Sequence, residues 1–206
     1  INLTENVTRI GNVAFSGCTL INNLTLPENV TYLGYSFISG TQITSITIPK
    51  SVISVGADTY GNFGKAYGPL TGAMQLKEVI FEDGMTSIPA YMCRTTYNDN
   101  WSSDTINNID TIRLPDSIET IGDYAFYNCD KITNVTLPKS LKKVGKAAFY
   151  DCGNLNIVSI PNSVTSIYSN AFGDCENLSI YGYADSYAQT YATENNIPFV
   201  VIDEDD

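Results

Sequence analysis

Apolar and polar residues follow one another along this chain in a pattern that returns at a fixed step. Its unit opens with apolar-x-x-apolar-x-apolar, as in Ile132, Val135 and Leu137, and the same string returns 23 residues later. The last three positions alternate between inward and outward, which predicts a short strand with one buried face. One such strand cannot bury its own apolar face, so we expect stacked units that bury a continuous one.

A proline directly after the strand marks the phase of each unit. Pro115, Pro138 and Pro161 stand 23 residues apart, and proline ends a strand because it has no N–H to donate to the ladder. Along the whole chain the steps of this position are 23, 22, 33, 33, 23, 23 and 23 residues, which predicts about eight coils, two of them longer. The position is filled in turn by Thr4, Pro27, Pro49, Glu82, Pro115, Pro138, Pro161 and Ala184.

The pattern predicts one ladder of parallel strands, about 4.8 Å apart. Phe126, Phe149 and Phe172 recur in step after a second apolar pair and a glycine, and we expect them to fill the core of each coil. The strands should centre on residues 24–26, 46–48, 79–81, 112–114, 135–137 and 158–160.

Three of the five cysteines also recur in step, at Cys129, Cys152 and Cys175. The distance between stacked coils lies within the range that a disulfide accepts. Equivalent positions on stacked coils nevertheless point in parallel and not at one another. We therefore expect free, buried thiols that pack as small apolar groups.

The unit LxxVxLPxSVxxIGxxAFxxC resembles the BspA-like class of leucine-rich repeats over nearly the whole chain. The tail IYGYADSYAQTYATENNIPFVVI resembles the ending of such arrays, with a helix that Asp185 or Ser186 would cap. The expected fold is a leucine-rich repeat solenoid. It is a β-rich, right-handed superhelix with a parallel strand ladder, short turns or 3-10 segments on the other side, and a helical C-terminal cap. Tyr168 and Pro89 depart from the unit at the glycine and Glu82 departs at the proline, which affects local geometry.

We expect residues 1–206 to form a single leucine-rich repeat domain. Its start matches only the second half of a unit, which favours a fragment of a longer protein. The extra residues of the two long units are expected as insertions at 57–75 and 94–108. Residues 178–206 are expected to form the C-terminal capping repeat and tail.

The composition excludes several kinds of chemistry. Acidic residues number 22 against 11 basic ones, and a net charge of -11 disfavours nucleic acid as a partner. The chain has no histidine, no C-x-x-C pair and no phosphate-binding GK[ST] loop, so we expect no enzyme activity, no metal site and no cofactor. No apolar run approaches the roughly 20 residues of a membrane span, so we expect no membrane insertion.

Two surfaces are candidates for binding. The outward strand positions form a flat polar strip that includes Thr47, Ile80, Arg113 and Thr136, and simple solvation is the alternative. The two insertions should emerge on the same side of adjacent coils, where insertions into repeats often bind partners. Their aromatic residues would either form a recognition surface or fold down as a self-packed bulge. The aromatic candidates are Tyr60, Phe63, Tyr67, Tyr97 and Trp101.

The resemblance implies a secreted or surface-displayed protein of host-associated bacteria, located outside the cell or at its surface. Such proteins are usually adhesins, which implies a host matrix or cell-surface protein as partner and allows a glycan. The alternative is a non-catalytic carbohydrate-binding or scaffold segment of a larger secreted enzyme. Fold alone does not decide between them.

Overall fold

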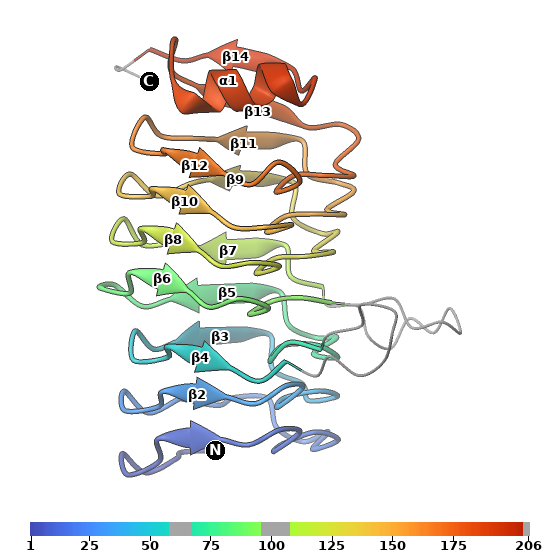
Figure 1. Cartoon of the computed structure of the whole chain (residues 1–206). Coiled ribbons are helices and arrows are strands. Elements are labelled where there is room, and N and C mark those ends of the chain that lie inside the picture. The colour runs from blue at the N-terminus through green and yellow to red at the C-terminus, as the bar shows by residue number, and fades with distance from the viewer. Residues whose placement is uncertain (58–66, 96–107, 204–206) are drawn as a thin grey trace.

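The computed structural model describes residues 1–57, 67–95 and 108–203, which form a solenoid of stacked coils. In Figure 1 the chain climbs from the N-terminus to the C-terminus. Its longer strands lie at the back and point left, and its shorter strands lie in front and point right. This winding is right-handed, as parallel strands and their crossovers strongly prefer.

The longer strands form what we call the strand face. Its residues alternate between buried and exposed, as in β3, because one side of each strand faces the core. Every pairing on this face is parallel. The strands are β3 (Ser45–Ile48), β5 (Glu78–Phe81), β7 (Thr111–Arg113), β9 (Asn134–Thr136), β11 (Ile157–Ser159), β13 (Ser179–Gly182) and β14 (Phe199–Val201).

Five of the six predicted strand positions are confirmed within one residue. The exception is 24–26, where the structure has a single bridge between Thr25 and Asn2. No strand pairing joins Thr25 to β3 in the described chain, and this break coincides with the step of 22 residues, one fewer than the regular unit. A second break separates β7 from β9.

The prediction of one ladder with turns or 3-10 segments opposite was incomplete, because a second ladder of two-residue strands lies there. No 3-10 helix occurs in the part of the chain that the structure describes. The extended residues of one coil lie directly over those of the coil below, so the backbones of the two coils pair. One example is the bond from the Gly122 N–H to the Ile88 carbonyl at 2.9 Å. The strands of this second face are β1 (Arg9–Ile10), β2 (Tyr32–Leu33), β4 (Ser54–Val55), β6 (Ser87–Ile88), β8 (Thr120–Ile121), β10 (Lys143–Val144) and β12 (Ser166–Ile167).

A ladder of phenylalanines fills the core, as predicted. The ring centroids of Phe126 and Phe149 lie 5.0 Å apart, and those of Phe149 and Phe172 lie 5.3 Å apart, both pairs stacked. Tyr191 closes the upper end of the ladder, edge-on to Phe172 at 6.0 Å. Phe126 and Phe149 have no exposed surface, so the interior is continuous from coil to coil.

The recurring cysteines are free, as predicted, and each has a defined hydrogen bond. The thiols of Cys152 and Cys175 both donate at 3.2 Å to the carbonyls of Phe126 and Phe149 in the coil below. Burial raises the pKa of Cys175 to about 11, so its thiol stays protonated and able to donate. Cys129 and Cys152 are buried, whereas Cys175 is half-buried, which the prediction of buried thiols did not anticipate.

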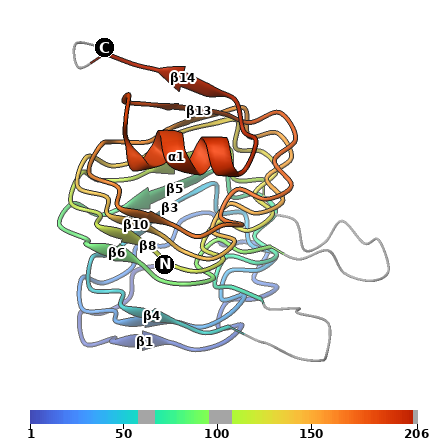
Figure 2. The same ribbon diagram turned by 45° about the horizontal axis from the view of Figure 1, so that its top comes forward.

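The predicted helical cap is present as α1 (Tyr187–Glu194), which lies across the upper end of the solenoid in Figure 2. Ser186 is its N-cap, since the side chain accepts from the Gln189 N–H at 3.3 Å. The Gln189 side chain in turn accepts from the Asp185 N–H at 2.7 Å. The two bonds resemble a capping box, with the reciprocal bond made to the residue before the N-cap, and they fix where the helix begins.

Candidate functional site

The strand face brings three of the four predicted strip residues into one row. Thr47 pairs with Ile80, and Ile80 pairs with Arg113, through the parallel register of β3, β5 and β7. Thr136 lies beyond the break in the ladder and pairs with Ser159 instead. Thr47, Arg113 and Thr136 are exposed, and Ile80 is half-buried.

The charges of this row are paired with one another. The Arg113 guanidinium Nε donates to Glu78 at 2.6 Å, and the Ser45 hydroxyl donates to the other carboxylate oxygen at 3.0 Å. These bonds, that of Arg113 first, hold the pKa of Glu78 below its usual value. The centre of the strip is therefore a self-satisfied polar network with little net charge to offer a partner.

A groove of about 410 Å³ lies on the strand face at its lower break. Its wall includes Thr47 of the predicted strip together with Asn23, Thr25 and Ser45. Glu28 and Glu82 add carboxylates, although Glu82 already accepts from the Lys50 backbone N–H at 2.8 Å. The groove offers mainly hydrogen-bond acceptors and hydroxyls.

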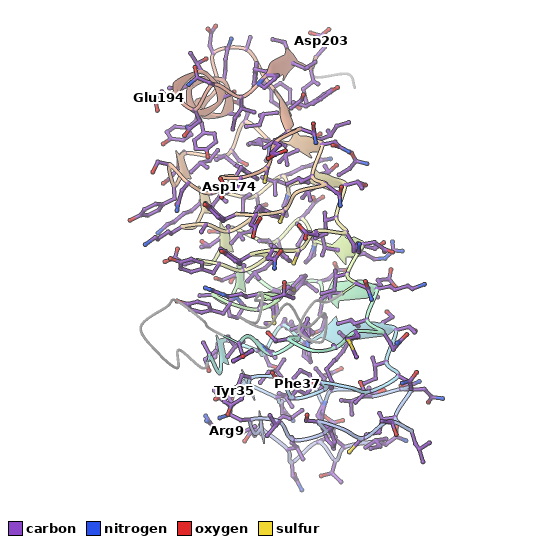
Figure 3. All side chains as sticks on the ribbon, turned by 90° about the vertical axis from the view of Figure 1, so that its right-hand side faces the viewer. Arg9, Tyr35, Phe37, Asp174, Glu194 and Asp203 are labelled. Carbon is purple, nitrogen blue, oxygen red and sulfur yellow. The ribbon has the colours of Figure 1, made fainter. Side chains whose placement is uncertain are left out.

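The second candidate surface is the side from which the two long units leave the coil, on the right in Figure 1. Four predicted aromatic residues, Tyr60, Phe63, Tyr97 and Trp101, lie outside the described residues. Tyr67 is described and is half-buried. We call this the insertion side, and Figure 3 views it face on.

The described parts of the two insertion segments touch each other. The Thr71 hydroxyl donates to the Arg94 carbonyl at 2.7 Å, and the Asn108 amide donates to the Met74 carbonyl at 2.6 Å. Each bond joins the segment 57–75 to the segment 94–108. Leu70 lies in the core and has no exposed surface, so part of the first segment belongs to the coil.

A cluster that we had not predicted lies beside these contacts. We call it the tyrosine–arginine cluster, made of Tyr91, Arg94, Tyr124, Tyr127 and Tyr150. Two pairs of rings are stacked, Tyr91 on Tyr124 at 5.2 Å and Tyr127 on Tyr150 at 5.5 Å. The Arg94 guanidinium carbon lies 4.5 Å from the centroid of Tyr127 and 4.9 Å from that of Tyr124. Such cation–π contacts anchor an arginine firmly when it is withdrawn from water.

Hydrogen bonding and packing hold the upper end of this cluster. Asp174 accepts a hydrogen bond from the Tyr150 hydroxyl, which is the main reason that the pKa of Tyr150 is raised to about 12. A Cβ at Gly173 would lie 2.7 Å from two carbons of the Tyr150 ring, so the absence of a side chain there makes room for the ring. Arg94 and Gly173 thus lie against the stacked pair of Tyr127 and Tyr150, and both tyrosines remain half-buried, with part of each side chain accessible.

The sequence carried a signal for this cluster. Tyr127 and Tyr150 stand 23 residues apart, and Tyr91 and Tyr124 stand 33 apart, so both pairs follow the step of their units. Recurrence on stacked coils predicts contact for these tyrosines, as it does for the phenylalanines and the cysteines.

The described residues contain no group of three acidic, cysteine or histidine side chains placed to hold a metal ion. They also contain no helix that is long and apolar enough to span a membrane.

Comparison with known protein families gives one match that covers most of the chain. The model of the BspA type leucine-rich repeat region matches residues 1–102 and 95–193, with six copies. No curated protein matches the chain significantly.

Solved structures share the fold. A leucine-rich repeat protein from Bacteroides ovatus is 26% identical with a TM-score of 0.64, and the match covers 98% of this chain and 54% of that one. A leucine-rich cell surface protein from Faecalibacterium prausnitzii is 18% identical with a TM-score of 0.50, over 98% of this chain and 59% of that one. The T. pallidum leucine-rich repeat protein is 22% identical with a TM-score of 0.51, over 80% of this chain and 69% of that one.

This chain therefore spans little more than half the length of the first two of these proteins. The repeat seen in the sequence, the stacked parallel coils and the family match over most of the residues agree. The chain belongs to the BspA-type leucine-rich repeat family.

Proposed function

We propose that this chain is a non-catalytic, adhesin-like module that binds a macromolecule of a host or of a neighbouring cell through its insertion side. The observation that carries the proposal is the contact between the two insertion segments beside the tyrosine–arginine cluster. Tyrosine is among the residues most often found at the energetic centre of protein interfaces. The tyrosines of the cluster are half-buried, and the buried Arg94 would hold their rings in place.

The family supports the kind of function. Leucine-rich repeats are a protein-interaction type of fold, and stacked repeats present extended surfaces to partners. One solved relative is described as a cell surface protein, which supports a location at the cell surface for this chain as well. The partner would be a host matrix or cell-surface protein, with Tyr60, Phe63, Tyr67, Tyr97 and Trp101 as candidate contacts.

The strand face is the weaker candidate. Its central charges are satisfied within the row of Ser45, Glu78 and Arg113, so a partner would have to break these bonds or leave them unused. The insertion side departs from the regular unit, whereas the strip repeats it. Departure from a repeat is where a particular partner can be specified.

The test is binding to a panel of host extracellular-matrix proteins, measured by biolayer interferometry with the chain immobilised. Three forms are compared: the parent, a chain in which short Gly-Ser links replace 58–66 and 96–107, and Thr136→Arg on the strand face. We expect a panel member to bind the parent and Thr136→Arg equally, and to bind the shortened chain at least about tenfold more weakly. Equal binding by the shortened chain, with loss in Thr136→Arg, would contradict the proposal and favour the strand face.

A glycan array run on the same three forms separates the alternative. Binding to glycans with no binding to any matrix protein would favour a carbohydrate-binding segment of a larger enzyme.

A further inference from the structure

A single coil of this acidic chain carries an excess of positive charge. Five of the 11 basic residues fall within 131–146, and that stretch has no acidic residue. Four of them lie in the turn before β10, in β10 or directly after it, and all four are exposed. We call Lys139, Lys142, Lys143 and Lys146 the lysine row. Lys139 lies in the turn before β10, Lys142 and Lys143 lie at its start, and Lys146 follows it, so the four lysines border one edge of a single coil.

The acidic residues of the coil below offset only part of this charge, because three carboxylates, those of Asp116, Glu119 and Asp123, lie under four lysines. Asp116 and Asp123 accept hydrogen bonds from the backbone N–H groups of Lys139 and Lys146, at 3.4 Å and 2.8 Å. Their carboxylates therefore hold the two coils together. Among the described residues, Lys142 is the member of the row that pairs with a carboxylate, Glu119, at 2.8 Å.

The coil above the row has no charge at all. Residues 153–173 contain neither acidic nor basic side chains. β12 lies directly beside β10, with Ser166 paired to Lys143. The neighbouring exposed positions Asn162, Thr165 and Ser169 add amide and hydroxyl groups. The lysines therefore border a neutral surface rich in hydrogen-bonding groups.

One aromatic side chain rises from this neutral coil. Tyr168 stands where most units have the glycine, and it is 50% exposed, more than any other tyrosine of the described residues. It follows β12 as Gly145 follows β10, and the Tyr168 N–H bonds to the Val144 carbonyl at 3.1 Å. The departure from the repeat thus places an open ring next to the end of the lysine row.

We propose that the lysine row and Tyr168 form a binding surface for an anionic polysaccharide. Ammonium groups donate charge-assisted hydrogen bonds to sulfate or carboxylate groups. Hydroxyl and amide side chains can bond to sugar hydroxyls, and an exposed aromatic ring packs against the apolar face of a pyranose. An acidic peptide would use the lysines equally well, but it has no use for the neutral coil and the open ring.

This surface lies on the second face, in front in Figure 1. Its Lys146 end borders the tyrosine–arginine cluster, since the Lys146 Nζ lies 5.9 Å from the ring centroid of Tyr124. The inference does not depend on a protein partner, and its failure would leave the proposed function standing.

The test is isothermal titration calorimetry with a heparin octasaccharide as probe, at two salt concentrations. We expect Lys143→Gln with Lys146→Gln to weaken binding about tenfold, because two charge-assisted contacts to sulfate or carboxylate groups are lost, and to weaken it less at the higher salt concentration. Lys77→Gln with Lys131→Gln makes the same charge change at exposed positions outside the row, and should weaken binding less than about twofold.

Tyr168→Ala separates ring packing from charge. We expect it to weaken heparin binding while leaving the dependence of the affinity on salt unchanged, because no ionic contact is removed. The side chain is half exposed, so folding should persist, which circular dichroism checks.

Three outcomes would overturn the inference: no binding of heparin by the parent, equal losses in the two lysine pairs, or unchanged binding by Tyr168→Ala. Polyglutamate of matched charge is the competing probe. If it binds the parent as tightly as heparin and loses affinity in the same variants, the row recognises acidic protein and not a glycan.

Discussion

Asn128, Asp151 and Asp174 each precede a recurring cysteine, and each has a positive φ, of 55°, 59° and 56°. Gly17 holds the same place before Cys18 with a φ of 74°. Glycine, asparagine and aspartate are the residues that tolerate this left-handed conformation best. The recurring acidic residues at this turn are thus explained by backbone geometry, and they need no catalytic role.

A prediction at this scale concerns the phenylalanine ladder. Phe149 is stacked on both sides and fully buried, so Phe149→Ala should lower the free energy of unfolding by about 3–5 kcal/mol. Lys142→Ala is the control, since its exposed ion pair with Glu119 contributes at most about 1 kcal/mol. Urea melts measure both variants, and equal midpoints would show that Phe149 is not a core residue.

The glycine of the repeat allows a second, matched comparison. A Cβ at Gly122 would lie 2.5 Å from the Ala90 nitrogen of the coil below, whereas a Cβ at Gly11 in the first coil meets nothing within 4 Å. Gly122→Ala should therefore destabilise the fold by about 1–3 kcal/mol through overpacking. Gly11→Ala should be near neutral. Thermal melts of the two variants would contradict close stacking if they coincided.

At the scale of elements, the apolar residues before the proline position were enough to place β3, β5, β7, β9 and β11, whether the step between units was 22, 23 or 33 residues. The short strands were missed because two residues cannot display an alternation, and their pairing depends on how the coils stack. The breaks beside β3 and between β7 and β9 were missed as well. The step of 22 hinted at the first, but 23 residues separate the prolines across the second, so spacing alone carries no signal for it.

The candidate site was harder to predict from the sequence than the fold was. The aromatic residues of the insertions could be selected as candidates because they break the repeat. Tyr127 and Tyr150 follow the repeat, so nothing in their spacing distinguishes them from other residues of the regular units. That Arg94 lies against these rings depends on the coil of Tyr91 stacking under that of Tyr124, which the irregular spacing of the long units obscured.

A prediction at the element scale concerns the cap. The Ser186 hydroxyl accepts from the first turn of α1, so Ser186→Ala should lower the free energy of unfolding by about 0.5–2 kcal/mol. Ser186→Asp keeps an acceptor at the N-cap and should restore most of the loss. Guanidinium melts measure the free energy of unfolding of both variants. If the aspartate variant is destabilised as much as the alanine variant, the hydroxyl does not act as a cap.

At the scale of the whole molecule, the stacked coils give different faces different chemistry. The strand face is polar and internally paired, the insertion side is aromatic, and the second face holds the lysine row within a chain of net charge -11. A solenoid can do this because each face collects one position from every coil.

Two buried groups that lose a proton at high pH, the Cys175 thiol and the Tyr191 hydroxyl, predict how the free energy of unfolding depends on pH. Burial raises the pKa of Cys175 to about 11 and that of Tyr191 to about 12, above the usual values of about 8.5 for cysteine and 10 for tyrosine. Between those values the unfolded chain has lost protons that the folded chain still holds. The free energy of unfolding must therefore fall as the pH rises from about 9 to 12.

Thermal melts at pH 7, 9, 10 and 11 measure this fall. Cys175→Ala removes one of the groups and should flatten the decline between pH 9 and 11. A melting temperature that rises or stays level over this range in the parent would contradict the burial of these groups.

Hydrogen–deuterium exchange of the chain, with and without a bound matrix protein from the binding panel, tests most directly where the partner sits. The proposed function predicts new protection in peptides that cover 57–75, 94–108 and 124–127, with little change on the strand face. Protection confined to 45–47, 78–80, 111–113 and 134–136 would place the partner on the strand face and contradict the account.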